Sequence, residues 1–366
     1  ASIAVIGAGI VGTATSWHLR RLGYAVILVD PSVASAVPKA SSQRCLNGST
    51  ASLGVLMGHA FRRSSGRGWR LRQRSMALWP EWVVQLDDPT SPLSLQTPLV
   101  QLASSDEEAE RMRQLAEARP HAGLRFLDEQ TLTPAPHPWP RPGHGALLSE
   151  RDGRVDPLGL LRALRRAFDA EGGATQATSV EHLQRSDAAR GGRWQVITAE
   201  GDRFNVDAVV ICSALGSSPL LEPLGHHRPM EAVLGQVLDL KLPNPHPGWT
   251  GWPAVLTCGG INLIPHGDQQ LWLGATVEPG TVADSSLVSA MTTLNNQAPS
   301  WLREAERIGQ WQGLRARPQG RPAPLLETLE PGLILASGHY RNGVLLAPAS
   351  AEWVGQQIDS PFLTGP

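Results

Sequence analysis

The chain has 366 residues, of which 41% are hydrophobic and 18% are charged, and its formal net charge is −1. This length and composition are typical of a soluble globular protein with a sizeable core and two domains. A net charge so close to zero excludes a protein that binds nucleic acid electrostatically over its whole surface. No apolar run approaches the ~18 residues needed to span a membrane.

The three cysteines, Cys45, Cys212 and Cys258, lie far apart in the sequence and have no C-x-x-C spacing. This usage is typical of a reducing compartment and argues against both a zinc site and a disulfide framework. We therefore expect a cytoplasmic protein that binds no metal, no nucleic acid and no membrane. A homo-oligomer remains open.

The N-terminal segment predicts one β-α-β unit. Residues 2–6 are apolar and rich in β-branched side chains, which predicts a buried strand. Residues 10–22 have helical spacing and end at Gly23, a natural residue for closing a helix. Residues 25–29 then predict a second buried strand.

A glycine-rich turn, Gly7-x-Gly9-x-x-Gly12, lies between the first strand and the helix. The first glycine allows the tight turn, the second lets a pyrophosphate approach the backbone, and the third packs the helix against the strand. Asp30, at the end of the second strand, is placed to accept hydrogen bonds from an adenosine ribose. The unit predicts a dinucleotide site but does not separate NAD from FAD. An unliganded turn is the structural alternative.

The remaining chain alternates strands and helices, with a β-rich stretch in the middle. Helices are predicted over residues 69–86, 105–118, 158–171, 287–296, 301–305 and 349–358. Strands are predicted over residues 99–103, 194–199, 206–212, 233–240, 261–276 and 333–337. The pattern is that of a parallel α/β core at both ends of the chain with a mixed segment inserted between them.

The segment Gly338 to Pro348, GHYRNGVLLAP, resembles the flavin-contacting C-terminal motif of the D-amino acid oxidase superfamily, most closely that of the glycine oxidases. Four other segments are similar to parts of the same family. They are the small-residue loop at 49–55, a strand and turn at 207–216, a hairpin at 264–276, and Gly313-Leu314-Arg315.

The resemblance implies an α/β fold, with a Rossmann-like FAD-binding domain of the glutathione-reductase type. An α+β substrate domain, built on a mixed or antiparallel sheet, is inserted into it. The implied FAD-binding domain consists of residues 1–57, 141–225 and 310–366, and the substrate or cap domain of residues 58–140 and 226–309.

The motif and the resemblance together predict non-covalent FAD. Relatives with covalent FAD attach it to a cysteine upstream of the C-terminal motif, and no cysteine follows Cys258 here. The helix after Gly343 is expected to direct its positive end at the flavin. The predicted cofactor-binding residues are Gly7, Gly9, Ile10, Val11, Gly12, Asp30, Pro31, Gly48, Ser49, Leu53, Gly54, Val55, Val180, Gly216, Gly338, His339, Tyr340, Arg341, Asn342, Gly343, Val344 and Leu345.

The predicted substrate-binding residues are Arg315, Arg341 and Asn262. Arginine binds a carboxylate bidentately and stays charged when buried, so the two arginines are candidate anchors for a carboxylate substrate. A structural ion pair is the alternative for each. Asn262 stands where glycine oxidases carry a tyrosine on the hairpin, which weakens the case for glycine itself as the substrate.

The implied reaction is oxidation of a small amino acid or amine, with hydride passing from the substrate α-carbon to flavin N5. The imine would hydrolyse to an oxo acid, and O₂ would reoxidise the flavin and give H₂O₂. No catalytic acid or base is required if the amine arrives neutral. The alternatives are a dehydrogenase of the same fold that reduces a quinone or other acceptor, a flavin-binding protein without amine oxidase activity, and a nicotinamide dehydrogenase.

A run of arginines, Arg62-Arg63-x3-Arg67-x2-Arg70-x-Arg72-x-Arg74, has no counterpart in this resemblance. Such a run usually forms a solvated helix face. It could otherwise bind a phosphate, an anionic partner or an acidic substrate.

Overall fold

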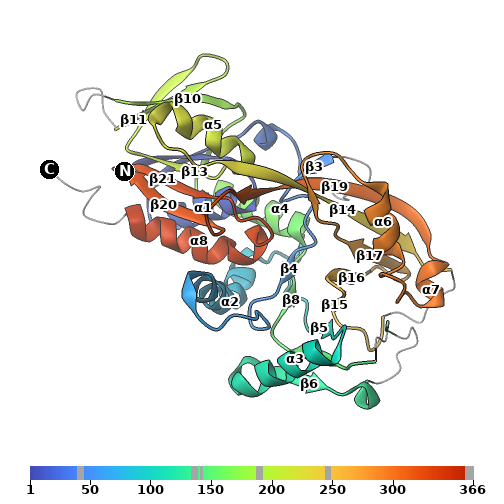
Figure 1. The fold of residues 1–366 in the computed structure, drawn as a ribbon. Coiled ribbons are helices and arrows are strands. Elements are labelled where there is room, and N and C mark those ends of the chain that lie inside the picture. Colours follow the sequence, from blue (N-terminus) through green and yellow to red (C-terminus); the bar gives the residue numbers. More distant parts are fainter. Residues whose placement is uncertain (39–44, 133–138, 141–142, 187–192, 244–248, 359–366) are drawn as a thin grey trace.

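The computed structural model describes residues 1–38, 45–132, 139–140, 143–186, 193–243 and 249–358. Two large β-sheets form the framework, and they lie side by side with most helices packed around the first (Figure 1). Within the described ranges, no helix is both long and apolar enough to cross a membrane.

The first sheet has six strands and contains the predicted β-α-β unit. Its order is β20 (Leu325–Glu330), β21 (Leu333–Ser337), β13 (Ala208–Ile211), β1 (Ser2–Ile6), β2 (Ala25–Val29) and β9 (Ala174–Gln176). All neighbours pair in parallel except β20 and β21. The helix of the unit is α1 (Ile10–Arg21), so the three predicted N-terminal elements are confirmed.

The two faces of this sheet are covered by different layers. Ile3 and Val5 of β1 pack into a core formed with α1, α2 (Gly66–Leu86), α4 (Pro157–Ala170) and α8 (Gly343–Ile358). Ala4 and Ile6, which alternate with them, pack against α5 (Ser217–Leu221) and a three-stranded sheet of β10 (Val180–Arg185), β11 (Trp194–Thr198) and β12 (Arg203–Val206). A strand with both faces buried needs an uninterrupted apolar run, and residues 2–6 provide one.

The second sheet has ten strands and is mixed. Its order is β3 (Cys45–Asn47), β19 (Glu306–Pro318), β14 (Met230–Lys241), β17 (Gln270–Gly274), β16 (Ile261–His266), β15 (Val255–Cys258), β5 (Leu99–Leu102), β7 (Ala146–Ser149) and β6 (Leu124–Leu127), with β18 (Glu278–Pro279) paired to β14. Most pairs are antiparallel, whereas β3–β19 and β15–β5 are parallel. The predicted hairpin corresponds to β16 and β17. The predicted α/β fold with a mixed second sheet is therefore confirmed.

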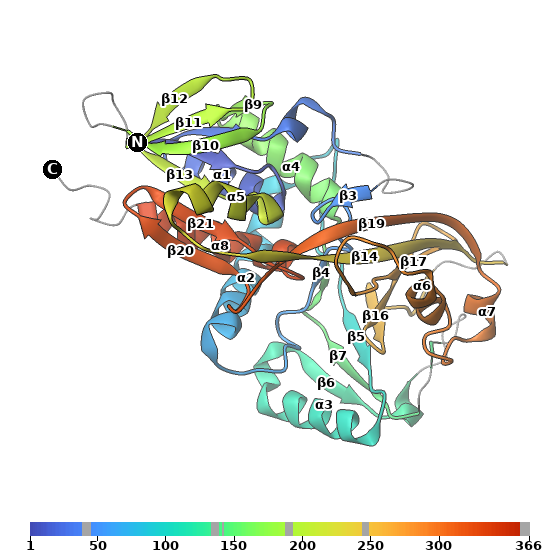
Figure 2. The same ribbon diagram turned by 45° about the horizontal axis from the view of Figure 1, so that its top comes forward.

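Three helices and one small ribbon accompany the second sheet. They are α3 (Asp106–Ala118), α6 (Ser285–Thr292), α7 (Ser300–Arg303) and the pair β4 (Val55–Leu56) and β8 (Gly153–Arg154). The strands β14 and β19 run side by side from near α5 along one side of the second sheet (Figure 2). They are the longest strands among the described residues, with 12 and 13 residues.

Some elements do not follow the predicted domain boundaries. Helix α2, predicted as part of the substrate domain, packs on the first core, and the Nε1–H of Trp79 donates to the carbonyl of Leu345 in α8 (3.0 Å). Strand β19 crosses the predicted boundary at 309/310, and β7 pairs within the second sheet. The boundary at 140/141 and residues 359–366 lie outside the described residues. The domain division stays a prediction.

Candidate functional site

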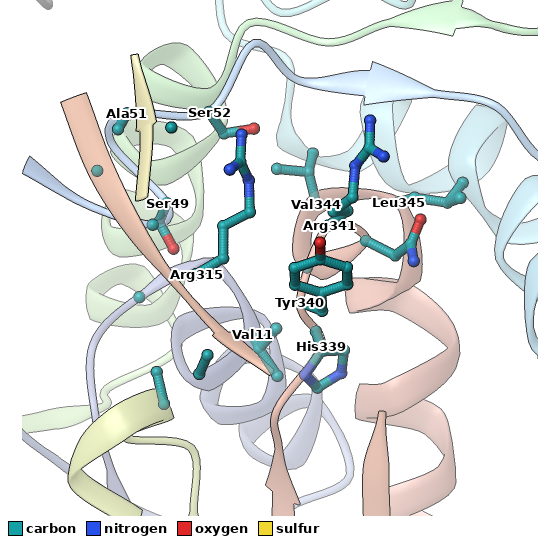
Figure 3. Close-up of a pocket in the computed structure, with 18 of the residues that line it drawn as sticks. Val11, Ser49, Ala51, Ser52, Arg315, His339, Tyr340, Arg341, Val344 and Leu345 are labelled. Atoms are coloured by element: carbon teal, nitrogen blue, oxygen red, sulfur yellow. The ribbon is translucent and has the colours of Figure 1, made fainter. Parts of the chain in front are cut away.

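A cavity of about 660 Å³ lies between the two sheets. Its walls come from the N-terminal turn, the loop 47–57, the strands of the second sheet and the segment 336–345 (Figure 3). The two ends of the chain therefore contribute to one cavity, as the sequence predicts.

The N-terminal turn has the geometry that a pyrophosphate site needs. Gly7 has φ +103°, a value that side-chain-bearing residues rarely adopt. A Cβ on Gly12 would lie 1.8 Å from the carbonyl oxygen of Gly7, so α1 packs against the turn only because that atom is missing. Gly9 faces the Ser49 hydroxyl, which accepts a hydrogen bond from the N–H of Ile10 (2.9 Å). Gly7 and Gly9 thus face the cavity without side chains at the start of α1, where Ser49 binds the N–H of Ile10.

Asp30 lies at the end of β2 on the rim of the cavity. Its carboxylate accepts from the N–H of Ala8 (2.9 Å) and from the N–H of Ser32 (2.7 Å), which fixes the side chain. The N–H of Asp30 donates to the carbonyl of Gln176 (3.1 Å). Since a carboxylate has about four lone-pair sites, Asp30 can still accept from a ribose hydroxyl.

Hydrogen bonds from three other segments hold the small-residue loop 49–55 in place. Besides the Ser49–Ile10 contact, the Nε1–H of Trp311 donates to the carbonyl of Ala51 (3.0 Å), and Arg154 donates to that of Leu53 (3.3 Å). Arg154 is only 4% exposed. A loop with small side chains leaves room for a flat ligand, and these bonds keep its backbone in place.

The C-terminal segment enters the cavity just before α8. Tyr340 has φ +55°, an unusual value for a residue with a side chain, and its N–H donates to the carbonyl of Ala316 in β19 (3.1 Å). Such strain persists where the surrounding structure determines it, often at functional sites. His339 is buried, its Nε2 lies 2.9 Å from the hydroxyl of Ser350, and burial lowers its pKa to about 3. It is therefore neutral near pH 7.

Arg315 and Arg341, both predicted as anchors, line the same cavity and flank Tyr340 (Figure 3). Arg315 donates to the carbonyls of Leu234 (3.1 Å) and Thr276 (3.2 Å). Burial and the nearby positive charge of Arg341 lower the pKa of Arg315, although an arginine remains charged. The two positive charges repel each other, and an anion bound between them would relieve this repulsion.

Gly235 makes room for Arg315, and the sequence prediction did not include it. A Cβ on Gly235 would lie 2.3 Å from an Nη of Arg315. A glycine inside the predicted strand 233–240 is itself a signal of close approach, so this residue was open to prediction.

Asn262 also lines the cavity, from β16. Its Oδ1 accepts from the hydroxyl of Thr257 (2.9 Å) on the neighbouring strand. The amide group is thus held by the sheet.

Five of the predicted cofactor residues do not line the cavity: Ile10, Gly12, Pro31, Val180 and Gly216. Ile10 and Gly12 belong to the turn through the contacts given above, and Pro31 follows Asp30 in a 3₁₀ turn. Val180 opens β10, four residues after the Gln176 carbonyl that binds Asp30. Gly216 lies just before α5.

The arginine run has no single role in the structure. Arg62, Arg63, Arg70 and Arg74 are exposed, as expected for a solvated face. Arg67 donates to the carbonyls of Pro324 and Leu326 (both 3.1 Å). Arg72 lines the cavity together with Phe61. The sequence could not distinguish Arg72 from its neighbours, because only tertiary packing separates them.

Comparison with known proteins gives one family over nearly the whole chain. The family model of FAD dependent oxidoreductases, DAO, matches residues 2–357. A curated relative, the glycine oxidase of Geobacillus kaustophilus, is 25% identical over 372 residues, which is 98% of this chain and 92% of that protein.

Solved structures support the same fold. A crystal structure of glycine oxidase from Geobacillus kaustophilus has a TM-score of 0.80 at 22% identity and covers 98% of this chain and 94% of its own. A structure of L-proline dehydrogenase from P. horikoshii has a TM-score of 0.78 at 18% identity, with 98% and 93% covered.

Proposed function

Because the chain belongs to the DAO family of FAD-dependent oxidoreductases, we propose that it oxidises a small amino acid or amine that carries a carboxylate. The observation that carries this proposal is that Arg315 of β19 and Arg341 lie on either side of Tyr340 in the cavity, just before α8 (Figure 3). The relative named glycine oxidase supports the same substrate class, because glycine is an amino acid.

The residues present fit FAD. The turn faces the cavity through Gly7, Gly9 and Val11 and leaves the start of α1 for the pyrophosphate, and Asp30 lines the cavity where it would accept from a ribose hydroxyl. The segment from Gly338 to Leu345 and the loop 49–55 line the rest of the cavity with backbone and small side chains. We assign these residues to the cofactor, and Val180 and Gly216 stay predictions.

Bound FAD would supply the hydride acceptor for the substrate α-carbon. The chain itself would bind and orient the substrate. Arg315, fixed by the carbonyls of Leu234 and Thr276, would hold the carboxylate, and Arg341 would approach it from the other side. Asp30 and His339 are the only carboxylate and imidazole groups among the described residues that line the cavity, and the pKa of His339 is lowered to about 3. A neutral amine requires neither group as a base.

The electron acceptor is a separate question. Oxidation by O₂ with release of H₂O₂ is our first expectation, in line with the glycine oxidase relative. A dehydrogenase that reduces another acceptor is the second candidate. Detection of H₂O₂ during turnover under air distinguishes the two. Cytoplasmic location and self-association stay predictions, and the free thiols of Cys212 and Cys258 agree with a reducing compartment.

The test is anaerobic reduction of the FAD-loaded protein by glycine, sarcosine, N-alkyl glycines, and D- and L-amino acids, followed by flavin absorbance. We expect at least one carboxylate-bearing amine to bleach the flavin, while the corresponding amine without a carboxylate does so far more slowly. If no amine reduces a flavin that dithionite reduces normally, amine oxidation is not the function of this chain.

A further inference from the structure

Arg72 is a cavity-lining cation for which the proposed function provides no role. It belongs to α2, which packs on the first core, and it lines the cavity. Together with Arg315 and Arg341 it gives three arginines among the described residues that line the cavity. Asp30 is the only described carboxylate there, and it is bound to the N–H groups of Ala8 and Ser32 at the turn.

The guanidinium of Arg72 is positioned but not neutralised. Its Cζ lies 3.8 Å from the centroid of the Phe61 ring, a cation–π contact, and an Nη donates to the carbonyl of Gly68 (3.3 Å). Its Nε is buried without a hydrogen-bond partner. Protein atoms cover this Nε, so an anion in the cavity would bind the guanidinium through its Nη atoms, where a charge-assisted hydrogen bond would form.

The wall that carries Phe61 is rigid. The carboxylate of Asp152, which is fully buried, accepts from the N–H groups of Gly58 and His59 (both 2.9 Å) and of Ala60 (2.7 Å). Arg119 binds the same segment through its carbonyls, with donations to those of His59 and Phe61 (both 2.6 Å). The ring under Arg72 is therefore held in place before any ligand arrives.

The pyrophosphate of FAD is assigned to the N-terminal glycine turn, and one substrate carboxylate to Arg315 and Arg341, so Arg72 is the cavity arginine to which no anion is assigned. An amino acid with one carboxylate, bound between Arg315 and Arg341, would leave Arg72 as an unpaired cation in the same cavity. We propose that Arg72 and Phe61 form a second anion subsite, and that the preferred substrate is an amine with two carboxylates, one held by Arg315 and Arg341 and the other by Arg72. This inference rests on the proposed function, because it specifies the substrate class of that site.

The first test compares matched substrates on the FAD-loaded protein. Aspartate and glutamate are paired with alanine and 2-aminobutyrate, in both enantiomers, and iminodiacetate is paired with sarcosine. The rate of anaerobic flavin reduction divided by the apparent dissociation constant is measured for each. We expect the dicarboxylic partner to be favoured by roughly 10- to 100-fold, the range for a charge-assisted hydrogen bond. Equal values within each pair overturn the inference and leave amine oxidation intact.

The second test needs no turnover. Succinate and glutarate, compared with acetate and butyrate, are titrated into the FAD-loaded protein and their dissociation constants are measured by calorimetry. We expect tighter binding of the dicarboxylates even if the correct amine has not been found. If no amine reduces the flavin but this preference holds and depends on Arg72, the proposed function fails while the anion subsite stands.

Variants assign the preference to Arg72. Arg72→Gln should abolish the preference for two carboxylates and change the values for monocarboxylic ligands by less than about threefold, because the Arg315–Arg341 pair is untouched. Arg72→Lys, which keeps the charge, should restore part of it. Arg70→Gln, an exposed arginine on the same helix, is the matched control and should behave as the wild type. Flavin content and melting temperature identify any variant that misfolds. Full retention of the preference in folded Arg72→Gln overturns the inference.

Discussion

Arg341 and Arg315 determine, in our proposal, which amines the protein can oxidise. Arg341→Ala removes one of the two cations beside Tyr340, so we expect kcat/KM for a monocarboxylic amine to fall by roughly 10- to 150-fold, the equivalent of ~1.5–3 kcal/mol for a charged hydrogen bond. Steady-state and anaerobic kinetics measure this loss. The control is Arg321→Gln, which changes an exposed arginine between β19 and β20 and should leave the kinetics unchanged. Unaltered reduction by Arg341→Ala contradicts the anchor assignment.

Gly235 acts on the same chemistry through the position of Arg315. Gly235→Ala places a Cβ 2.3 Å from an Nη of Arg315, so the guanidinium must leave its carbonyl partners. We expect kcat/KM for a carboxylate substrate to fall about tenfold or more, with the FAD dissociation constant within about twofold of the wild type. Kinetics and flavin titration on the same preparation check both values. A variant that loses FAD and activity together would mean that Gly235 serves the fold instead.

His339 links folding to pH. Its pKa is about 3 in the folded state, lowered by burial from 6.5, so it binds a proton more readily when the chain is unfolded. Its contribution to stability is therefore fully present above about pH 6.5 and is lost as pH falls toward 3, by up to about 1.4 kcal/mol per pH unit. Urea unfolding of wild type and His339→Gln at pH 7.5 and pH 5 should show a smaller pH effect in the variant. Equal pH effects would contradict this prediction.

The sequence predicted cavity residues correctly where they belong to a recognisable motif or lie at a characteristic distance from one. Arg341 lies within the motif Gly338 to Pro348, and Arg315 lies about 25 residues before it, so the resemblance assigned both, and both line the cavity. Arg72 and Phe61 have no such frame. They are brought to the cavity by the packing of α2 and by Asp152, a residue about 90 positions from the backbone groups that it binds.

At the scale of elements, α8 illustrates how packing overrides a local signal. The local pattern predicts a helix from about residue 349, just after Pro348, a residue that lacks the N–H of the helical ladder, whereas the resemblance implies a helix directly after Gly343. The helix begins at Gly343, with Pro348 buried inside it. Val344 to Ala351 are all buried, so the hydrophobic gain of the first turns outweighs one missing hydrogen bond.

The loop beside the proposed flavin position depends on Arg154 from β8. Arg154→Met removes the donor to the carbonyl of buried Leu53, which is then left unpaired, and the donor to the exposed side chain of Gln96. We expect the protein to lose roughly 1–3 kcal/mol of unfolding free energy and to bind FAD more weakly. Chemical denaturation of the apo form and flavin titration measure the two effects. Arg151→Met, which removes an exposed arginine of the preceding turn, is the control. Unchanged FAD affinity would show that the loop keeps its shape without Arg154.

At the scale of the whole molecule, the cavity has walls from both sheets, so cofactor binding and folding are coupled. We expect FAD to stabilise the protein by about 2.7 kcal/mol when its free concentration is 100 times the dissociation constant. Thermal unfolding at a series of FAD concentrations measures this. Riboflavin, which lacks the pyrophosphate and adenosine, should stabilise less, because it cannot use the turn at Gly7 and Asp30. Equal stabilisation by riboflavin would contradict the dinucleotide assignment.

The overall architecture was predictable in its first sheet and only in outline in its second. Continuous apolar runs such as residues 2–6 and 333–337 identify buried parallel strands by themselves. The parallel pairing of β5 with β15, which joins residues 99–101 to 255–257, depends on contacts distant in sequence, and no local pattern determines it. Strand β10 was missed because its side chains are mostly exposed and its pattern is weak.

Strand β19 positions both the C-terminal segment at Tyr340 and the side chain of Arg315. The carbonyl of Ala316 receives the N–H of Tyr340, and the neighbouring residue, Arg315, directs its side chain into the cavity. In the proposed complex, the spacing between the substrate carboxylate and the C-terminal flavin segment is therefore set by two adjacent residues of one strand. A substitution that displaces β19 at this point would change carboxylate binding and the position of the flavin segment together.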